Sequence, residues 1–251
     1  MIFCRTVIRK NKIPGLLFVK MKIKAIILSA GKGTRMNQSI SKQYLMLGGQ
    51  TILSYSLEMF QKSSIDEIIL VTSKDEIEYV RNNIVLPHGI DKVKKIVSGG
   101  QERYHSVYQG LLAAGECDYI MIHDGARPFL TIEIIEESIK EVKKCHACAI
   151  GVPIKDSIKK VGLEGYIEEN IDRKDVWQIQ TPQSFYYPLI MEAYKKLMES
   201  EIKPTDDTAV IEFFTNSKIK MLLGNYENIK ITTIEDLEFG EYLIKKRKKI
   251  K

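Results

Sequence analysis

The sequence has little cysteine and no long apolar run. None of its apolar stretches is long enough to cross a membrane. Its 251 residues include only four cysteines, Cys4, Cys117, Cys145 and Cys148, too few for a disulfide framework in a chain of this length. Cys145 and Cys148 form a C-x-x-C pair, but no second pair or suitably spaced histidines accompany them, so we interpret them as buried thiols rather than a metal or redox site. We therefore expect a reducing, cytoplasmic compartment and no membrane partner.

Two common nucleotide-binding motifs are also missing. A dinucleotide fingerprint needs G-x-G-x-x-G, and after Gly31 and Gly33 the third glycine position holds Met36. A Walker A loop needs four residues between its glycines and then Gly-Lys-Ser or Gly-Lys-Thr, and Gly31 and Gly33 are too close for that. These absences disfavour a dehydrogenase and a P-loop enzyme.

The body of the chain lacks the positive charge that the net value of +6 suggests. Residues 1–20 carry five basic and no acidic residues, and residues 245–251 carry six basic and no acidic ones. Without these ends, the 38 basic residues fall to 27 against 32 acidic residues, a net charge of −5. This distribution argues against a nucleic-acid partner. We interpret residues 245–251 as a basic tail at a solvated helix end, with contact to RNA or anionic lipid as the alternative.

Residues 1–20 fit neither the strand nor the helix pattern of the remainder. We interpret them as a non-native or disordered extension, with Met21 as the true start. A cleaved transit peptide is the alternative, although the segment contains no serine and only one threonine.

From residue 25 onward, strand-like apolar runs alternate with helix-like segments. This alternation predicts an α/β fold, a single Rossmann-like domain with a mostly parallel sheet covered by helices on both faces. The strands are expected at 25–28, 66–72, 93–97, 119–123, 147–152, 177–180, 220–223 and 229–231. The helices are expected at 52–60, 74–83, 103–114, 131–144, 189–199 and 207–214, with a last helix that begins at Thr233.

A β-hairpin interrupts the alternation between residues 155 and 176. Two short strand-like segments, 157–161 and 166–170, flank the turn Gly162-Leu163-Glu164-Gly165. Such a hairpin is too small to form its own core. We expect a projecting arm that holds a second copy of the chain.

The segment from Ala25 to Tyr44, AIILSAGKGTRMNQSISKQY, carries the strongest chemical signal. A glycine-rich turn after a buried strand brings backbone N–H groups close to an anion. Arg35 and Lys42 then indicate a nucleoside triphosphate, and hence phosphoryl or nucleotidyl transfer. An ordinary strand-to-helix turn with two solvated cations is the alternative.

Two further loops follow predicted strands, and ligands of parallel sheets bind beyond the carboxyl ends of such strands. Gly99-Gly100-Gln101-Glu102-Arg103 precedes a helix, and Ser106 can donate to or accept from a base edge. A plain turn with an N-cap is the alternative. His123 and Asp124 open the other loop, HDGARP; the acid can bind ribose or a metal-nucleotide, whereas His123 has no neighbour for a proton relay and reads as structural.

Seven segments, in order over roughly residues 23–240, resemble one family, 2-C-methyl-D-erythritol 4-phosphate cytidylyltransferase of the non-mevalonate isoprenoid pathway. They are SAGKGTRM with SKQY, GGQERYHSVYQGL, HDGARPF, VPIKDSIKKV, DRKDVWQIQTPQSF, TDDTAVIE and NIKITTIEDL. The resemblance implies a nucleotidyltransferase domain over residues 21–244. Ser157 stands where the family has threonine, which keeps the hydroxyl.

The resemblance also implies a reaction and residue roles. An oxygen of methylerythritol phosphate attacks the α-phosphorus of CTP, pyrophosphate leaves, and no protein nucleophile is needed. By similarity Arg35 and Lys42 stabilise the transition state, and Lys230 and Arg173 position the substrate phosphate. Arg173 and Ser157 reach the neighbouring subunit's site, which makes a homodimer the catalytic unit. Substrate binding falls to Ala30, Gly31, Gly33, Gly100, Ser106, Asp124 and Ser157.

The same resemblance implies Mg²⁺ held mainly by the CTP triphosphate, so we expect no firm protein metal ligand. A ribitol 5-phosphate cytidylyltransferase is the nearest alternative, since it shares the loop, the arm and the QTPQ segment. A catalytically idle protein that binds RNA through its basic tail is a third hypothesis. The retention of Arg35, Lys42, Arg173 and Lys230 argues against that hypothesis.

Overall fold

The structure is a computed structural model that describes residues 20–31 and 41–250. The predicted N-terminal extension lies outside the described residues except for Lys20, and Gly33 and Arg35 lie outside them too. Within the described part of the chain, no helix is both long and apolar enough to cross a membrane.

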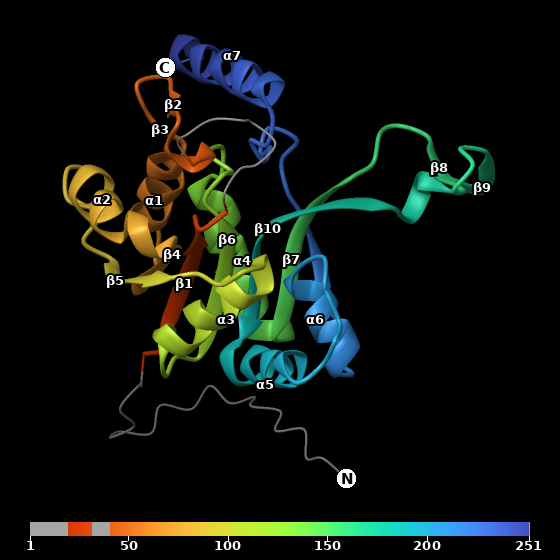
Figure 1. The fold of residues 1–251 in the computed structure, drawn as a ribbon, viewed down its shortest axis with the longest axis horizontal. Coiled ribbons are helices and arrows are strands. Elements are labelled where there is room, and N and C mark those ends of the chain that lie inside the picture. The colour runs from red at the N-terminus through yellow and green to blue at the C-terminus, as the bar shows by residue number, and fades with distance from the viewer. Residues whose placement is uncertain (1–19, 32–40, 251) are drawn as a thin grey trace, which may run out of the picture.

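A seven-stranded sheet of order β11-β7-β10-β6-β1-β4-β5 forms the centre of the molecule (Figure 1). All neighbours are parallel except that β10 runs antiparallel to β6 and β7, so the prediction of a mostly parallel sheet is confirmed. The inner strands are nearly continuous apolar runs because both faces of the sheet are covered. The strands are β1 (Ile23–Leu28), β4 (Glu67–Thr72), β5 (Val93–Ser98), β6 (Tyr119–Asp124), β7 (Ala147–Pro153), β10 (Trp177–Tyr186) and β11 (Lys220–Leu223).

Helices cover both faces of the sheet, as the alternating pattern predicts. Successive side chains of a strand point to opposite faces: Ile27 packs in one core cluster with Leu57 of α1, and Ile26 packs in the other with Leu111 of α3. Helices α1 (Ile52–Lys62) and α4 (Ile132–Cys145) belong to the first cluster. The second cluster contains α3 (Arg103–Ala114), α5 (Tyr187–Met198) and α6 (Asp207–Phe214).

The segment predicted as one helix over residues 74–83 is divided into three short helical pieces. A 3₁₀ turn η3 (Lys74–Glu76) leads into α2 (Ile77–Val80) and then into the π-helical turn η4 (Arg81–Val85). Val80, Ile84 and Val85 pack into the first cluster. The sequence therefore predicted a helical segment here, but not the change in helical pitch or the burial of these three residues.

The predicted projecting β-hairpin is confirmed, and its role in holding a second copy of the chain stays a prediction. Strands β8 (Ile158–Val161) and β9 (Ile167–Ile171) pair antiparallel, and Figure 1 shows them projecting from the body. Gly165 has a φ of +83° in the turn, where a side chain would be strained. The 3₁₀ turn η5 (Arg173–Asp175) then leads back to the sheet.

Strand β10 is longer than the predicted 177–180, because it continues through Pro182 to Tyr186. A proline normally interrupts a central strand, since it cannot donate to the ladder. Here the pairing of β10 with β7 shifts register between Ile179 and Gln183, and this irregularity accommodates Pro182, whose peptide bond with Thr181 is cis.

A third small core lies above the strand ends and involves α7 (Ile234–Ile250). Leu243 and Ile244 of this helix pack with Leu47 of a small, unpredicted ladder of β2 (Met46–Leu47) and β3 (Gln50–Thr51). The predicted tail at 245–251 begins inside this continuous helix. The capping pattern is confirmed, since Thr233 Oγ1 accepts from the N–H of Asp236 (3.3 Å) and Asp236 Oδ2 from the N–H of Thr233 (2.9 Å).

The prediction of a strand at 229–231 is wrong. The segment has no regular structure and makes only one described backbone hydrogen bond to the body, from Ile231 N to the carbonyl of Ala126 (2.9 Å). Its isoleucines are apolar because they join the third core, with Ile231 fully buried and Ile229 packed against it.

Candidate active site

The carboxyl ends of β1, β5 and β6 meet at one pocket of about 1020 Å³. Parallel pairing aligns these ends; Leu28, for example, is the partner of Asp124. Among the described residues, the pocket collects seven of the predicted site residues: Ala30, Gly31, Lys42, Gly100, Ser106, Asp124 and Lys230. Gly33 and Arg35 lie outside the described residues, and the roles of all nine residues stay predictions.

The loop after β1 is held at both of its described ends. Gln43, in the 3₁₀ turn η2 (Lys42–Tyr44), is buried and donates to the carbonyls of Ser29 and Gly31. The Tyr44 hydroxyl lies 2.6 Å from Thr72 Oγ1 and 3.0 Å from Glu76 Oε2. These contacts fix the turn that places Lys42 on the pocket wall. Sequence reasoning missed Gln43, although it stands inside the SKQY segment.

Two glycines form the opposite wall. A Cβ atom on Gly99 would lie 2.5 Å from the Cβ of Ala30 and 2.6 Å from Ser106 Oγ, so only glycine fits between these two loops. Ser106 Oγ accepts from the N–H of Gly100 (3.1 Å) and donates to the carbonyl of Glu102 (3.3 Å). The N-cap of α3 is Glu102.

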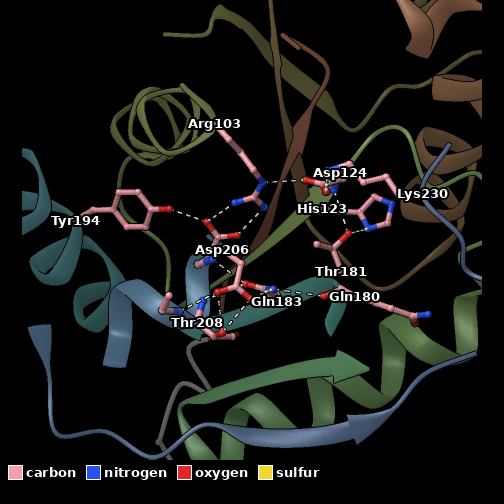
Figure 2. Close-up of polar contacts among 12 residues, drawn as sticks. Arg103, His123, Asp124, Gln180, Thr181, Gln183, Tyr194, Asp206, Thr208 and Lys230 are labelled. Atoms are coloured by element: carbon pink, nitrogen blue, oxygen red, sulfur yellow. Dashed lines mark hydrogen bonds and ion pairs between the residues drawn. The ribbon is translucent and has the colours of Figure 1, made fainter. Parts of the chain in front are cut away.

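The charge at the centre of the pocket is Asp124, at the end of β6. Arg103 Nε lies 3.1 Å from its Oδ1, and Lys230 Nζ lies 2.7 Å from its Oδ2 (Figure 2). Burial alone would raise the pKa of this carboxyl, but Arg103, Lys230 and Arg127 hold it well below its usual range. Asp124 is therefore charged at neutral pH.

His123, one residue earlier, does not line the pocket. Its side chain is fully buried, its Nδ1 lies 3.0 Å from Thr181 Oγ1, and its ring packs 5.4 Å from that of Phe60. Burial lowers the pKa of His123 to about 3, so the ring is neutral. These surroundings fit the structural role that the sequence predicts.

Ser157 and Arg173 do not line the pocket of their own chain. Both belong to the arm, where Arg173 donates to the carbonyl of Lys155. The arm exposes apolar side chains, with Tyr166 at 75% and Ile167 at 65% of full exposure. Exposed apolar side chains gathered on one projection are typical of an interaction surface.

Among the described residues, no group of three or more His, Cys, Asp or Glu side chains is placed to hold a metal ion. Cys145 ends α4 and Cys148 is buried in β7, which confirms the predicted placement. Both are free thiols, and burial raises the pKa of Cys148. Cys117 is also free, and burial raises its pKa to about 12.

A mostly parallel sheet, glycine loops at its carboxyl edge and lysines around one pocket define a nucleotide-binding α/β enzyme of the nucleotidyltransferase class. Residues 23–246 match the family described as 2-C-methyl-D-erythritol 4-phosphate cytidylyltransferase (IspD). The chain belongs to this family, so the predicted family and enzyme class are confirmed.

Individual relatives agree with this assignment. A 2-C-methyl-D-erythritol 4-phosphate cytidylyltransferase of Clostridium kluyveri is 47% identical over 227 residues, which cover 90% of this chain and 98% of the relative. The crystal structure of 4-diphosphocytidyl-2C-methyl-D-erythritol synthase from Anaerococcus prevotii aligns with a TM-score of 0.80 at 35% identity, covering 90% of this chain and 96% of that one. The cytidylyltransferase of Thermus thermophilus, at 22% identity, shares the fold with a TM-score of 0.72 over 90% of this chain and all of its own.

Proposed function

We propose that the pocket at the carboxyl edge of the sheet carries out the family's reaction. The chain transfers CMP from CTP to 2-C-methyl-D-erythritol 4-phosphate, which gives 4-diphosphocytidyl-2-C-methyl-D-erythritol and pyrophosphate. The observation that carries this proposal is the convergence of the glycine loop, Gly100, Ser106, Asp124 and Lys230 in one pocket, within a chain that matches the family over residues 23–246.

The chemistry needs positioning and charge neutralisation rather than a protein nucleophile. An acceptor phosphate oxygen forms a bond to the α-phosphorus while the bond to pyrophosphate breaks, and negative charge grows on the α-phosphate oxygens. Lys42 on the pocket wall, with Arg35, neutralises this charge. Lys230, held by Asp124, binds the acceptor phosphate.

The nucleotide base lies against the two glycine-containing walls. Backbone groups at Ala30, Gly31 and Gly100 approach it closely because no side chain intervenes at the glycines, and Ser106 adds a hydroxyl. The hydroxyl already accepts from Gly100 and donates to Glu102, so its orientation is fixed before the base binds. Such pre-organisation lowers the entropic cost of binding.

A divalent cation, which we propose to be Mg²⁺, accompanies the triphosphate. Among the described residues, three acidic side chains line the pocket, Asp75, Glu102 and Asp124, and both oxygens of Asp124 already meet a cation. The triphosphate oxygens would therefore supply most of the ligands of the ion, which is usual for Mg²⁺ bound with a nucleotide. When bound, the ion neutralises charge on the triphosphate.

We further propose a homodimer in which the arm completes the partner's site. Arg173 and Ser157 lie on the projecting arm outside the pocket of their own chain, and the arm exposes apolar side chains. A symmetric exchange of arms places these residues in the other pocket. The three free thiols fit a reducing compartment, and we propose the cytoplasm.

The test is pyrophosphate release from CTP and Mg²⁺, with methylerythritol 4-phosphate and ribitol 5-phosphate assayed side by side. Release with methylerythritol phosphate alone is the expected result. Release with ribitol phosphate instead would keep the mechanism but contradict the proposed acceptor, and no release with either would contradict both.

A further inference from the structure

Two of the segments that resemble the family have no role in the mechanism above: the QTPQ segment of β10 and the TDDT segment that begins α6. They meet beneath the pocket. Gln183 Oε1 accepts from the backbone N–H groups of Asp207 (3.0 Å) and Thr208 (3.1 Å), and its Nε2 donates to Asp206 Oδ2 (3.0 Å) (Figure 2). Asp206 Oδ1 in turn accepts from the N–H of Ala209 (2.9 Å). The first turn of α6 is therefore fixed by the Gln183 side chain of β10 and by the helix's own N-cap, Asp206.

These contacts of Gln183 and Asp206 determine the position of Asp207, whose side chain is completely buried. A buried carboxylate must be paired or it destabilises the fold. Tyr194 Oη of α5 donates to Asp207 Oδ1 (2.6 Å), and Arg103 donates to both oxygens, from Nη1 (2.9 Å) and Nη2 (2.8 Å). The guanidinium of Arg103 is thus held by a two-pronged contact on its inner side.

The remaining nitrogen of Arg103 faces the pocket. Its Nε donates to Asp124 Oδ1 (3.1 Å), while Lys230 occupies Asp124 Oδ2 (2.7 Å). The chain of contacts alternates in charge from Asp207 to Arg103, Asp124 and Lys230. Only a planar guanidinium can contact two carboxylates in this way, because its donors point in fixed, divergent directions.

We propose that Arg103 is a positioning residue, held by Asp207 and Tyr194, that orients Asp124 so that its second oxygen holds Lys230 at the acceptor phosphate. The QTPQ and TDDT segments serve this contact: they fix Asp207, which fixes Arg103. This inference rests on the proposed roles of Asp124 and Lys230. Arg103 acts through them and not on the reacting atoms.

The first test compares two hydroxyl deletions on the same helix. Tyr194→Phe removes the donor to Asp207, and Tyr187→Phe removes a donor to the carbonyl of Leu111 (3.0 Å), away from the pocket. Both variants lose one side-chain hydrogen bond, so the melting temperature of both should fall by a few degrees. Only Tyr194→Phe should lower kcat/KM for the acceptor, by about tenfold, the lower end for a lost hydrogen bond to a charged group. Equal kinetics in the two variants would overturn the proposal.

The second test is chemical rescue. Arg103→Ala should lose most of its turnover and regain part of it when guanidinium chloride is added at non-denaturing concentration, whereas sodium chloride at equal ionic strength should have no effect. The double variant Arg103→Ala/Asp207→Asn should show no rescue, because the added cation has lost its inner partner. A merely structural role predicts no rescue in either variant, and that result would overturn the proposal.

Asp124→Asn separates this inference from the function on which it rests. If Asp124→Asn keeps normal turnover, the proposed role of Asp124 fails and the inference fails with it. If Asp124→Asn is impaired while Tyr194→Phe matches Tyr187→Phe and Arg103→Ala is not rescued, only the inference fails.

Discussion

Lys42 stands at the first position of η2, in a turn that Gln43 ties to the loop after β1. Its place on the pocket wall is fixed from the following side of the chain, because the next two residues, Gln43 and Tyr44, are buried. A charge fixed in advance stabilises a transition state better than one that must be reoriented. This fixed position is the physical reason to expect a large effect from its removal.

We expect Lys42→Ala to lower kcat by about 10²–10³-fold, the usual effect of removing one pre-organised charge or donor at a developing negative charge. Pyrophosphate release under saturating substrates measures this change. Lys143→Ala, which removes an exposed lysine at the end of α4, is the matched control and should be unchanged. A near-normal rate in Lys42→Ala would remove this residue from the mechanism.

His123 gives a prediction for stability rather than catalysis. Its pKa is about 3 in the folded chain but near 6.5 when unfolded, so between these values unfolding takes up a proton. Acid therefore favours the unfolded state, and this group should remove about 2 kcal/mol of stability between pH 7 and pH 5. Asp124 adds no pH dependence in that window, because its carboxyl is charged in both states.

Urea denaturation at pH 7 and pH 5 tests this prediction with His123→Gln as the comparison. The variant keeps a polar side chain that does not titrate, so its free energy of unfolding should fall less on acidification than that of the natural sequence. An equal fall in both proteins would show that His123 does not cause the acid sensitivity.

At the scale of elements, the arm carries the most specific prediction. If Arg173 serves the partner's pocket, mixing Arg173→Ala with Lys42→Ala creates mixed dimers in which one pocket has both residues intact. Random exchange of subunits makes half of the dimers mixed, so about one quarter of normal activity should return. Each variant alone should be nearly inactive.

The outcome separates two geometries. If verified subunit exchange restores no activity, Arg173 and Lys42 act in the same chain. Normal activity of Arg173→Ala alone would mean that Arg173 has no role. Ser157→Ala, also on the arm, should be complemented by Lys42→Ala in the same way, although its single loss should be milder because Ser157 supplies a hydroxyl and not a charge.

The elements differ in how well their sequences predict them. Strands such as β6, buried at every residue, and helices such as α4, with an apolar stripe, are predictable because burial imposes a period on the local sequence. The segment 229–231 was wrongly predicted as a strand, because its isoleucines fill the third core without pairing in a sheet. Pro182 concealed the second half of β10, since the bulge that accommodates it depends on β7.

The residues of the candidate site differ in the same way: some follow from a local sequence pattern, and others depend on contacts that the fold makes. Ala30, Gly31, Gly100 and Asp124 are predictable because they follow strands that end at one edge of the sheet. The contacts of Arg103 with Asp207 join residues 104 positions apart, and those of Gln43 are made with main-chain carbonyls. Neither leaves a local pattern, so only the assembled fold reveals them.

At the scale of the whole molecule, the body should not need residues 1–20. The last of them, Lys20, has its described contact with Asp66, and its side chain is 81% exposed. Exposed ion pairs contribute only about 0–1 kcal/mol. A chain that starts at Met21 should therefore keep its melting temperature within a few degrees and its full turnover.

Thermal denaturation and pyrophosphate release of the shortened chain measure both properties. The comparison chain carries Lys20→Ala in the full sequence and isolates the ion pair with Asp66. Loss of folding in the shortened chain alone would show that the first 19 residues contribute to the body.

The two legs of the arm are continuations of β7 and β10, neighbours in the sheet whose pairing extends outward through the hydrogen bond from Ile154 N to the carbonyl of Val176 (3.1 Å). The base of the arm is therefore a continuation of the central sheet and not a separate segment attached to it. Where β7 and β10 are paired, at the base of the arm, the side on which each residue faces alternates along the strand. Lengthening β7 and β10 by two paired residues each would move the hairpin outward and keep its side chains on the same side, whereas one residue in each would turn the exposed apolar surface of the hairpin over.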